Sequence, residues 1–197
     1  MTNLERDLSL EESMRTIENS MFRAGRVLFP HRSTRYPSAK IFQEQHPYFT
    51  VKVALDDCIF CRIVKHAAPS ITVYEDAMTL GFLDHYPLNP GHTLVIPKRH
   101  YETMREMPLS EVGDVFVSVA KVMRGVFKAT KADGINIGQS NGVAASQEVF
   151  HMHVHVIPRH TGDSPVGFTF PERKRSSLGE MERIGAMVRE AVAREGS

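Results

Sequence analysis

The chain has 197 residues, of which 42% are hydrophobic and 24% are charged, and its formal net charge is +1. This length is typical of one domain with additional segments, and the composition supports a real hydrophobic core. The balanced charge gives no indication of a nucleic acid or an anionic membrane as partner. No apolar run approaches the roughly 20 residues that a helix needs to cross a bilayer, so no membrane span is expected.

The N-terminus and the cysteines favour a cytoplasmic protein. Residues 5–12 contain several carboxylates, which is atypical of a signal or transit peptide. The chain has only two cysteines, Cys58 and Cys61, so a disulfide framework is not expected. A reducing compartment is then the default for these thiols.

Residues 1–54 are interpreted as an N-terminal extension. Ser9 and Glu12 match a capping box, in which each side chain satisfies a free amide at the start of a helix. Apolar residues then recur at helical spacing, which predicts a helix over residues 10–24. Its apolar stripe would cover this domain or a second subunit. The mixed stretch from residue 30 to 47 is predicted to be a loop.

The spacing of Cys58 and Cys61 has two chemical interpretations. A single Cys-x-x-Cys pair is weak evidence for zinc, because a structural zinc ion needs four ligands. Redox chemistry is the alternative, although the strand and helix that accompany a thioredoxin-type pair are not obvious here.

The middle of the chain predicts a sheet and one long helix. Short strands are expected over 71–75, 79–83 and 93–96, with a tight turn at Asp76 between the first two. An apolar stripe predicts a helix from Ser110, as N-cap, to about Ala129. A fourth strand is expected over 134–139, with Ile135 and Ile137 inward. A final helix is predicted over 178–193.

Three histidines alternate with apolar residues between His151 and Val156. Because successive side chains of a strand point to opposite faces, this pattern predicts a strand with its apolar residues in the core. The imidazoles of His151, His153 and His155 would form a row on the other, solvent-facing side, roughly 6.5 to 7 Å apart. Such a row suits either a metal site or nucleophilic and acid–base chemistry.

This row resembles the signature of the histidine triad (HIT) family, in which three histidines alternate with apolar residues. Further segments resemble the family in the same order, and the resemblance runs from about residue 56 to 159. They are Cys58-Ile59-Phe60-Cys61, Val73-Tyr74-Glu75-Asp76, Phe82-Leu83-Asp84, Pro90-Gly91-His92-Thr93-Leu94-Val95-Ile96-Pro97-Lys98-Arg99-His100 and Ser140-Asn141-Gly142.

The resemblance implies an α+β fold, in which an antiparallel sheet of about five strands packs against a long helix. The HIT domain would span residues 55–160, between the N-terminal extension and a C-terminal loop and helix over 161–197. Family members usually form two-fold dimers through the long helix and the sheet edge, so a homodimer is expected.

The resemblance also implies a structural zinc ion and no organic cofactor. Members with the cysteine pair bind zinc through both cysteines, the histidine after Pro-Lys and the first triad histidine. The ligands here would be Cys58, Cys61, His100 and His151, a closed tetrahedral set of the structural type.

The implied substrate is a purine nucleotide. Asp84 would accept hydrogen bonds from the ribose hydroxyls, and a polar loop would surround the α-phosphate. The loop departs from common family versions at Ser140, Ser146 and Glu148, which bears on the leaving group. The expected substrate-binding residues are Phe60, Ile63, Phe82 and His85 at the base, Asp84 at the ribose, and Ser140, Asn141, Ser146, Gln147, Glu148, His153 and His155 around the phosphate.

The implied reaction is hydrolysis at the α-phosphorus. His153, the middle histidine, would be the nucleophile, and His155 would hydrogen-bond a phosphate oxygen or help to move a proton. A nucleotidyl-histidine would form, and water would release AMP or GMP. The cysteine pair resembles the Hint branch, which cleaves nucleoside phosphoramidates. A diadenosine polyphosphate hydrolase of the Fhit type is the alternative enzyme. A nucleotide-binding scaffold with little turnover and a purely structural zinc module also remain open.

Overall fold

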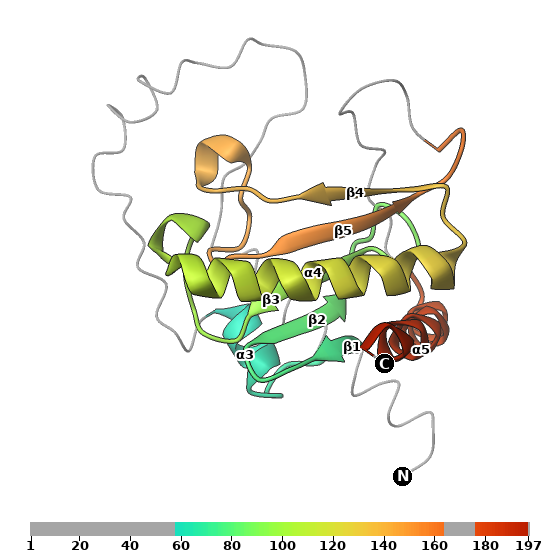
Figure 1. Ribbon diagram of the computed structural model, residues 1–197, viewed down its shortest axis with the longest axis horizontal. Helices are drawn as coiled ribbons and strands as arrows, with labels where there is room; N and C mark the ends of the chain where they lie inside the picture. Colours follow the sequence, from blue (N-terminus) through green and yellow to red (C-terminus); the bar gives the residue numbers. More distant parts are fainter. Residues whose placement is uncertain (1–57, 164–175, 197) are drawn as a thin grey trace. The chain divides into compact units, whose positions relative to one another are not determined.

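The structure of the protein is a computed structural model that describes residues 58–163 and 176–196 (Figure 1). The chain divides into two compact units, residues 1–69 and residues 70–197. The helix predicted over 10–24 and the loop predicted after it lie outside the described residues. Within the described part, no helix is both long and apolar enough to cross a membrane.

The described part of the first unit contains one short helix, α3 (Ile59–Val64). Cys58 is its N-cap residue, and Cys61 lies about one turn later. Both cysteines are therefore near the N-terminus of the helix. Both cysteines are buried, as are Phe60 and Ile63. The sequence analysis did not predict this helix.

The second unit is built on a five-stranded antiparallel sheet, which confirms the predicted fold class (Figure 1). The strand order is β1-β2-β3-β5-β4, so β1 and β4 are the edge strands. Four of the observed strands agree with the predicted ones to within one residue at each end, and the strand of the histidine row begins later than predicted. The strands are β1 (Thr72–Glu75), β2 (Thr79–Leu83), β3 (Thr93–Pro97), β4 (Gly134–Gly138) and β5 (Val154–Arg159).

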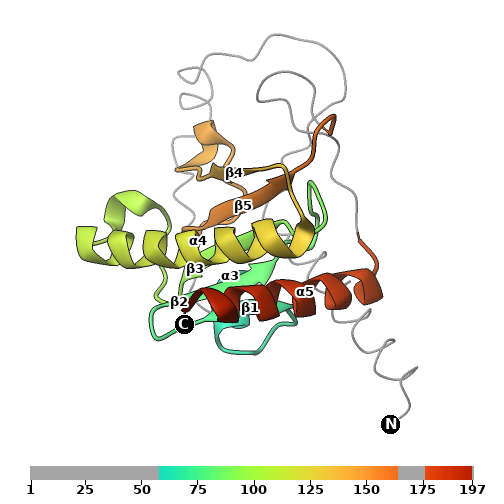
Figure 2. The same cartoon turned by 45° about the vertical axis from the view of Figure 1, so that its right-hand side comes forward.

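Two helices cover this sheet. Helix α4 (Leu109–Thr130) lies across one face, and α5 (Leu178–Ala193) lies beside both α4 and β1 (Figures 1 and 2). A Cβ atom at Gly125 would collide with Val192 of α5, so the close approach of the two helices depends on this glycine. The predicted N-cap of α4 is wrong, because the helix begins one residue before Ser110 and is preceded by Pro108.

The two faces of the sheet have different roles. Val95, Val154 and Val156 belong to the core cluster that includes the inward face of α4. On the opposite face, Phe82 pairs with Leu94, and Leu94 pairs with His155. Directly opposed residues of antiparallel strands project from the same side. Phe82 and His155 therefore share the face that α4 does not cover.

The histidine row differs from its prediction in two ways. Strand β5 begins only at Val154, so His151 and His153 precede it. Their side chains are buried, with exposures of 0% and 6%, and only His155 is partly exposed. The backbone leaves the ladder here because the Met152 amide donates to the Tyr101 carbonyl instead of to a strand. The alternation still holds, since the apolar residues 152, 154 and 156 are all in the core.

The prediction for the inward face of the fourth strand is half correct. Ile135 packs against the core, whereas 42% of Ile137 is exposed. β4 is an edge strand, so it has a neighbouring strand on one side only.

A partly buried polar network connects the first hairpin to α4. The Asp76 carboxylate accepts hydrogen bonds from the amides of Met78 and Thr79, at 2.8 and 2.7 Å, and from the hydroxyls of Tyr74 and Ser118, at 2.6 and 3.1 Å. Burial by itself would raise the pKa of Asp76, but these donors hold it well below the usual value of 3.8. This confirms the predicted turn and gives it a structural role.

We therefore expect Asp76→Ala to lower the free energy of unfolding by about 1 to 3 kcal/mol, because several partly buried donors lose a charged acceptor that water replaces only in part. Since folding lowers the pKa of Asp76, its contribution is present above about pH 4 and is lost as the pH falls below that value. Urea unfolding of the wild type and the variant between pH 3 and 7 measures both effects. Asp114→Ala, at an exposed position of α4, is the control and should change stability by no more than about 0.5 kcal/mol.

Candidate active site

The rings of His153 and His155 lie together at the start of β5. Their centroids are 4.9 Å apart and the rings are nearly perpendicular. His153 Nδ1 is 2.7 Å from the backbone carbonyl oxygen of His151. Because a carbonyl oxygen only accepts, His153 Nδ1 must carry the proton and donate. The lone pair of the neutral ring is then on Nε2, the nitrogen that can attack an electrophile.

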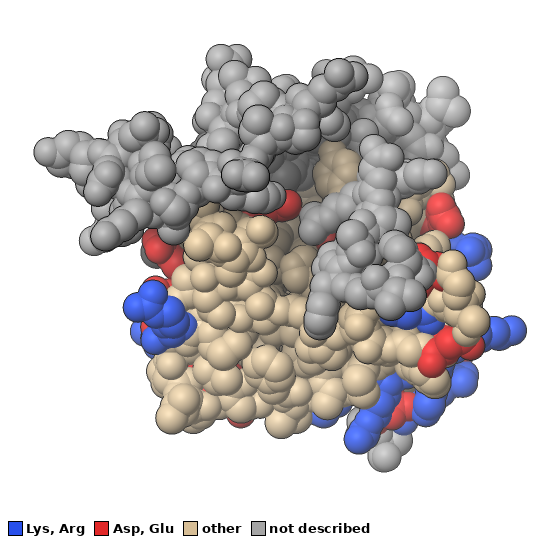
Figure 3. Space-filling view, turned by 90° about the horizontal axis from the view of Figure 1, so that it is seen from above, with Lys and Arg blue, Asp and Glu red and all other residues tan. Residues whose placement is uncertain are grey.

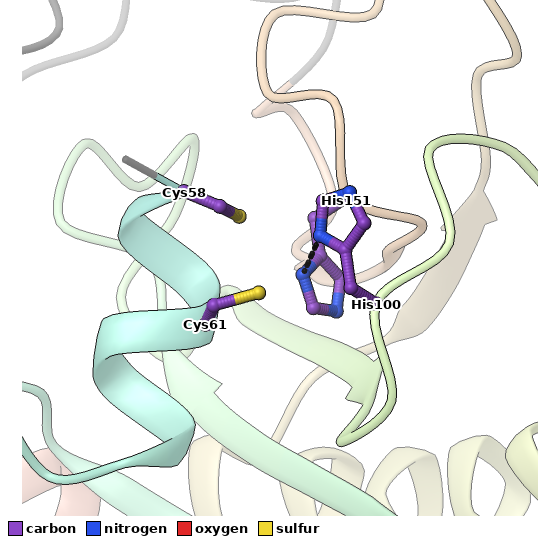
Figure 4. Close-up of side chains that lie close together, drawn as sticks. All are labelled: Cys58, Cys61, His100 and His151. Atoms are coloured by element: carbon purple, nitrogen blue, oxygen red, sulfur yellow. Dashed lines mark hydrogen bonds between the residues drawn. The ribbon is translucent and has the colours of Figure 1, made fainter. Parts of the chain in front are cut away.

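His151 has a different environment. Its Nε2 is 2.9 Å from the Pro97 carbonyl oxygen, so Nε2 donates and the lone pair is on Nδ1. Burial lowers the pKa of His151 to about 4, so the ring is neutral at physiological pH. His151 Nδ1 lies 3.3 Å from His100 Nδ1 (Figure 4). Two nitrogens that each bind a tetrahedral zinc ion at 2.0–2.1 Å lie roughly 3.3 to 3.4 Å apart, so this pair fits zinc.

The residues that could hold a metal ion include the predicted set. Cys58, Cys61, His100 and His151 form one candidate group of ligands. Cys58 is the N-cap residue of α3 and Cys61 lies in its first turn, whereas His100 follows β3 and His151 precedes β5. Two thiols and two imidazoles are the donor chemistry of a structural zinc site.

The predicted phosphate loop has a strained turn at its centre. The short 3-10 helix η2 (Val143–Ala145) follows Gly142, whose φ is +87°, and ends at Ser146, whose φ is +62°. The left-handed region favours glycine, so Ser146 has a backbone conformation that is unfavourable for a residue with a side chain.

The side chain of Gln147 stabilises this loop through three hydrogen bonds, and we call it the clamp of the loop. Its side-chain oxygen accepts a hydrogen bond from the Gly142 amide at 2.7 Å, and its nitrogen donates to the carbonyls of Glu102 and Val149, at 2.6 and 3.0 Å. The residue is 5% exposed. These contacts hold both ends of the loop. The adjacent Glu148 side chain is exposed.

The remaining predicted substrate residues lie in several places. Phe82 and Asp84 are buried and His85 is half-buried, all at the end of β2. The Asp84 carboxylate accepts from the Tyr86 amide at 2.9 Å. Asn141 accepts from the Met104 amide at 2.9 Å. Ser140 is half-buried in the same loop, and Phe60 and Ile63 are on α3 of the first unit.

Sequence reasoning missed one residue of this site. His92 Nε2 lies 2.9 Å from His155 Nδ1, and His92 Nδ1 lies 3.4 Å from an Asp84 carboxylate oxygen. His92 is 1% exposed. The available signal was its position between Gly91 and Thr93, immediately before a predicted strand. This position in the sequence does not show which side chain the His92 ring contacts.

Comparison with known proteins identifies the family. Residues 65–162 match the HIT domain. An uncharacterized HIT-like protein of Methanocaldococcus jannaschii is 47% identical over 124 residues, which cover 63% of this chain and 95% of that protein. The chain belongs to the HIT family.

Two relatives have named activities. An adenylylsulfatase of Arabidopsis thaliana is 44% identical over 108 residues, which cover 55% of each chain. An adenosine 5'-monophosphoramidase of Schizosaccharomyces pombe is 40% identical over 114 residues, which cover 58% of this HIT protein and 83% of the relative.

Among solved structures, a zinc-bound histidine triad family protein from Mycobacterium smegmatis is 38% identical, with a TM-score of 0.63. The match covers 72% of this chain and 96% of that one. A hypothetical histidine triad nucleotide-binding protein from Sulfolobus tokodaii is 36% identical, with a TM-score of 0.64 and coverage of 70% and 93%.

Removing the clamp should destabilise the protein. Gln147→Ala leaves the Gly142 amide and two carbonyls without their partner, so we expect the free energy of unfolding to fall by about 1 to 3 kcal/mol. Val143→Ala, in the same loop, shortens a side chain that is 66% exposed and should change the free energy of unfolding by less than about 0.5 kcal/mol. Urea unfolding at pH 7 measures both. Equal stability of the two variants would contradict the clamp.

Proposed function

We propose that this HIT protein is a nucleotide hydrolase that attacks the α-phosphate of a purine nucleoside phosphoramidate or a related nucleotide conjugate. The observation that carries the proposal is the His153 ring, whose bond to the His151 carbonyl leaves the lone pair on Nε2. The adenylylsulfatase and phosphoramidase names of the relatives support nucleotide hydrolysis as the class of reaction.

In the proposed reaction, His153 Nε2 attacks the α-phosphorus and the bond to the leaving group breaks. The leaving group takes up a proton from solvent as it departs, and the water molecule of the second step returns a proton to solvent. The Nδ1 proton stays on the ring, where the His151 carbonyl stabilises the positive charge that the imidazole acquires. A water molecule then attacks the nucleotidyl-histidine, restores the neutral ring and releases AMP or GMP. Backbone amides near residues 146–148 would stabilise the charge on the phosphate oxygens.

The proposed substrate contacts follow the same geometry. The row of Phe82, Leu94 and His155 leads across the sheet from the proposed base region to the proposed phosphate. Two strand spacings of about 4.8 Å separate its ends, roughly the distance from a base to its α-phosphate. Asp84 follows β2 at the base end, where it would bind the ribose hydroxyls. Phe60, Ile63 and His85 would complete the base pocket.

Incubation with an adenosine phosphoramidate, adenylyl sulfate and a diadenosine polyphosphate tests this function. We expect AMP release to be fastest from the phosphoramidate and to fall about a thousandfold or more in His153→Ala. Liquid chromatography of the products measures the rates. His160→Ala, at the half-buried histidine after β5, is the control and should keep wild-type turnover.

Each other result identifies an alternative. Preference for the polyphosphate would indicate the Fhit-type hydrolase. AMP binding without turnover of any of the three substrates would indicate a nucleotide-binding scaffold. Turnover that persists in His153→Ala would refute His153 as the nucleophile.

We also propose that Cys58, Cys61, His100 and His151 bind one zinc ion. Their donor set, the tautomer of His151 and the zinc-bound relative support this proposal. The ion would have a structural role, because all four positions of a tetrahedral site are occupied by protein. No step of the proposed reaction depends on it.

Purified protein should therefore contain about one zinc ion per chain, and a chelator should lower its melting temperature. His100→Gln should lose most of the zinc, whereas the matched His160→Gln should retain it. Elemental analysis and thermal unfolding measure these outcomes. Zinc-free wild-type protein whose melting is unaffected by added zinc would refute the site.

We propose that the protein is a homodimer joined through α4 and the edge strand β4. The outer surface of α4 exposes Val117 (57%) and Phe127 (45%), about three helical turns apart, and β4 exposes Ile137. On the face seen in Figure 3, the described surface is mostly uncharged across its middle, with charged side chains towards its margins. Exposed apolar side chains such as these three are common at interfaces between subunits.

A charge at this surface should separate the subunits. We expect the wild type to have twice the mass of one chain by light scattering and Val117→Lys to have the mass of one chain. Ala186→Lys introduces the same charge at an exposed position of α5 and should remain dimeric. A monomeric wild type would refute the dimer.

A further inference from the structure

The side chain of Asn89 connects the loop between β2 and β3 to the end of β5. Its Nδ2 group donates hydrogen bonds to the Pro158 carbonyl oxygen, at 2.8 Å, and to the Asp163 carboxylate. Both partners only accept, so the nitrogen of the Asn89 amide must face them, and it supplies a donor to each. The reaction proposed above assigns no role to Asn89 or to Asp163.

Several donors hold the Asp163 carboxylate in place. The Arg159 guanidinium donates to it from Nε at 3.1 Å and from Nη2 at 2.8 Å, and the His160 amide donates at 2.8 Å. The hydrogen bonds from Arg159 are the main cause that lowers the pKa of Asp163 to about 2, so the carboxylate is charged at neutral pH. Hydrogen bonds to an ionised acceptor are stronger than neutral ones, and Asn89 donates to such an acceptor.

Arg159 joins this cluster to the sheet. It is the last residue of β5, and its Nη1 group donates to Asn136 Oδ1 of β4 at 2.8 Å. Its carbonyl oxygen accepts from the Asp133 amide at 2.8 Å. The anchor of Asn89 therefore rests on two hydrogen-bonded strands of the sheet.

Gly91 brings the same loop against α4. Its φ is +95°, and a Cβ atom at this position would lie 2.5 Å from Thr130 Cγ2 and 3.6 Å from Pro158 Cγ. The first distance is far inside van der Waals contact, so a residue with a side chain could not come this close. The loop is thus held at Gly91 by the end of α4 and at Asn89 by the end of β5.

Two backbone hydrogen bonds connect Asn89 to Asp84. The His92 amide donates to the Asn89 carbonyl at 2.9 Å, and the Asp84 amide donates to the His92 carbonyl at 2.8 Å. Asp84 is the residue proposed to bind the ribose hydroxyls. A shift of Asn89 would therefore be passed to Asp84, and a hydrogen bond to a ligand is sensitive to shifts of this kind.

We propose that Asn89 and Asp163 are positioning residues that hold the loop of Asp84 where its carboxylate can reach the ribose hydroxyls, so that the protein prefers nucleotides with an intact ribose. The proposal rests on the nucleotide site and the role of Asp84 proposed above. It adds two residues outside the substrate contacts and a specificity for the sugar.

A purely structural role is the competing explanation. Hydrogen bonds of this kind also stabilise a fold, and their loss would lower the free energy of unfolding. A structural role would affect the binding of every nucleotide alike, whereas a positioning role acts on the sugar hydroxyls alone. A comparison of AMP with 2′,3′-dideoxy-AMP, which lacks both hydroxyls, separates these two explanations.

Calorimetric binding to the full-length protein is the first test. We expect the wild type to bind AMP about 10- to 100-fold more tightly than 2′,3′-dideoxy-AMP. Asp163→Ala should weaken the binding of AMP about 5- to 30-fold and that of the dideoxy ligand by less than about twofold. Asn89→Ala should show the same pattern. The double variant should bind AMP within about twofold of the single variants, because both act through one hydrogen bond.

Asp133→Ala is the matched control. Asp133 is an exposed carboxylate that accepts from the Thr161 amide at 2.7 Å, close in sequence to the Asp163 turn. Its removal leaves the hydrogen bond between Asn89 and Asp163 in place, so this variant should bind both ligands as the wild type does.

Turnover of an adenosine phosphoramidate gives a second readout. In Asp163→Ala we expect KM to rise about 5- to 30-fold and kcat to change by less than about threefold, because His153 and the phosphate loop are unaltered. Thermal unfolding shows whether each variant is folded. If Asp163→Ala does not fold, Asn89→Ala decides the question, since it keeps the ion pair between Asp163 and Arg159.

Equal effects on AMP and 2′,3′-dideoxy-AMP in a folded variant would overturn the proposal. So would a wild type that binds the two ligands equally, because Asp84 would then not bind the ribose. If the expected binding pattern occurs but no substrate is hydrolysed, the proposed hydrolase fails and the positioning role stands. If hydrolysis occurs but both variants keep the wild-type preference for the ribose, the hydrolase stands and the positioning role fails.

Discussion

The hydrogen bond from His153 Nδ1 to the His151 carbonyl exists because the backbone leaves the sheet before β5 begins. In a regular strand this carbonyl would accept from a neighbouring strand. Here the Met152 amide pairs with the Tyr101 carbonyl, and β3 offers its last carbonyl, that of Pro97, to the His151 side chain. The carbonyls that would accept hydrogen bonds from a neighbouring strand accept them from imidazoles instead. These side-chain hydrogen bonds orient the rings of His151 and His153.

In the second unit, helices cover the face of the sheet opposite to the one that carries the candidate site. Helix α4 packs on the valines of β3 and β5, and α5 adds to the same core beside β1. The face that α4 does not cover carries Phe82, Leu94 and His155 in register. A rigid sheet with one face committed to packing can present side chains on the other face at defined spacings, which is what a site for an elongated ligand such as a nucleotide requires.

Backbone groups also determine the chemistry of the site. The backbone carbonyl oxygen of His151 makes His153 Nδ1 a hydrogen-bond donor. A carbonyl does not titrate near neutral pH, so this assignment does not depend on another ionisable group. The arrangement differs from a Ser-His-Asp triad, in which a carboxylate fixes the tautomer of the base.

The sequence alone determined four of the strands, the long helix and the row of histidines, because alternation and helical periodicity report directly on which residues face a core. It implied the fold class through its resemblance to the HIT family. It also indicated the four candidate zinc ligands through the family motifs. Tertiary structure alone decided that β5 starts after His153, that Ile137 is exposed on an edge strand, and that His92 meets His155. Periodicity is local, whereas a ring's partner is a backbone group brought from another strand or loop, and that partner determines which nitrogen carries the proton.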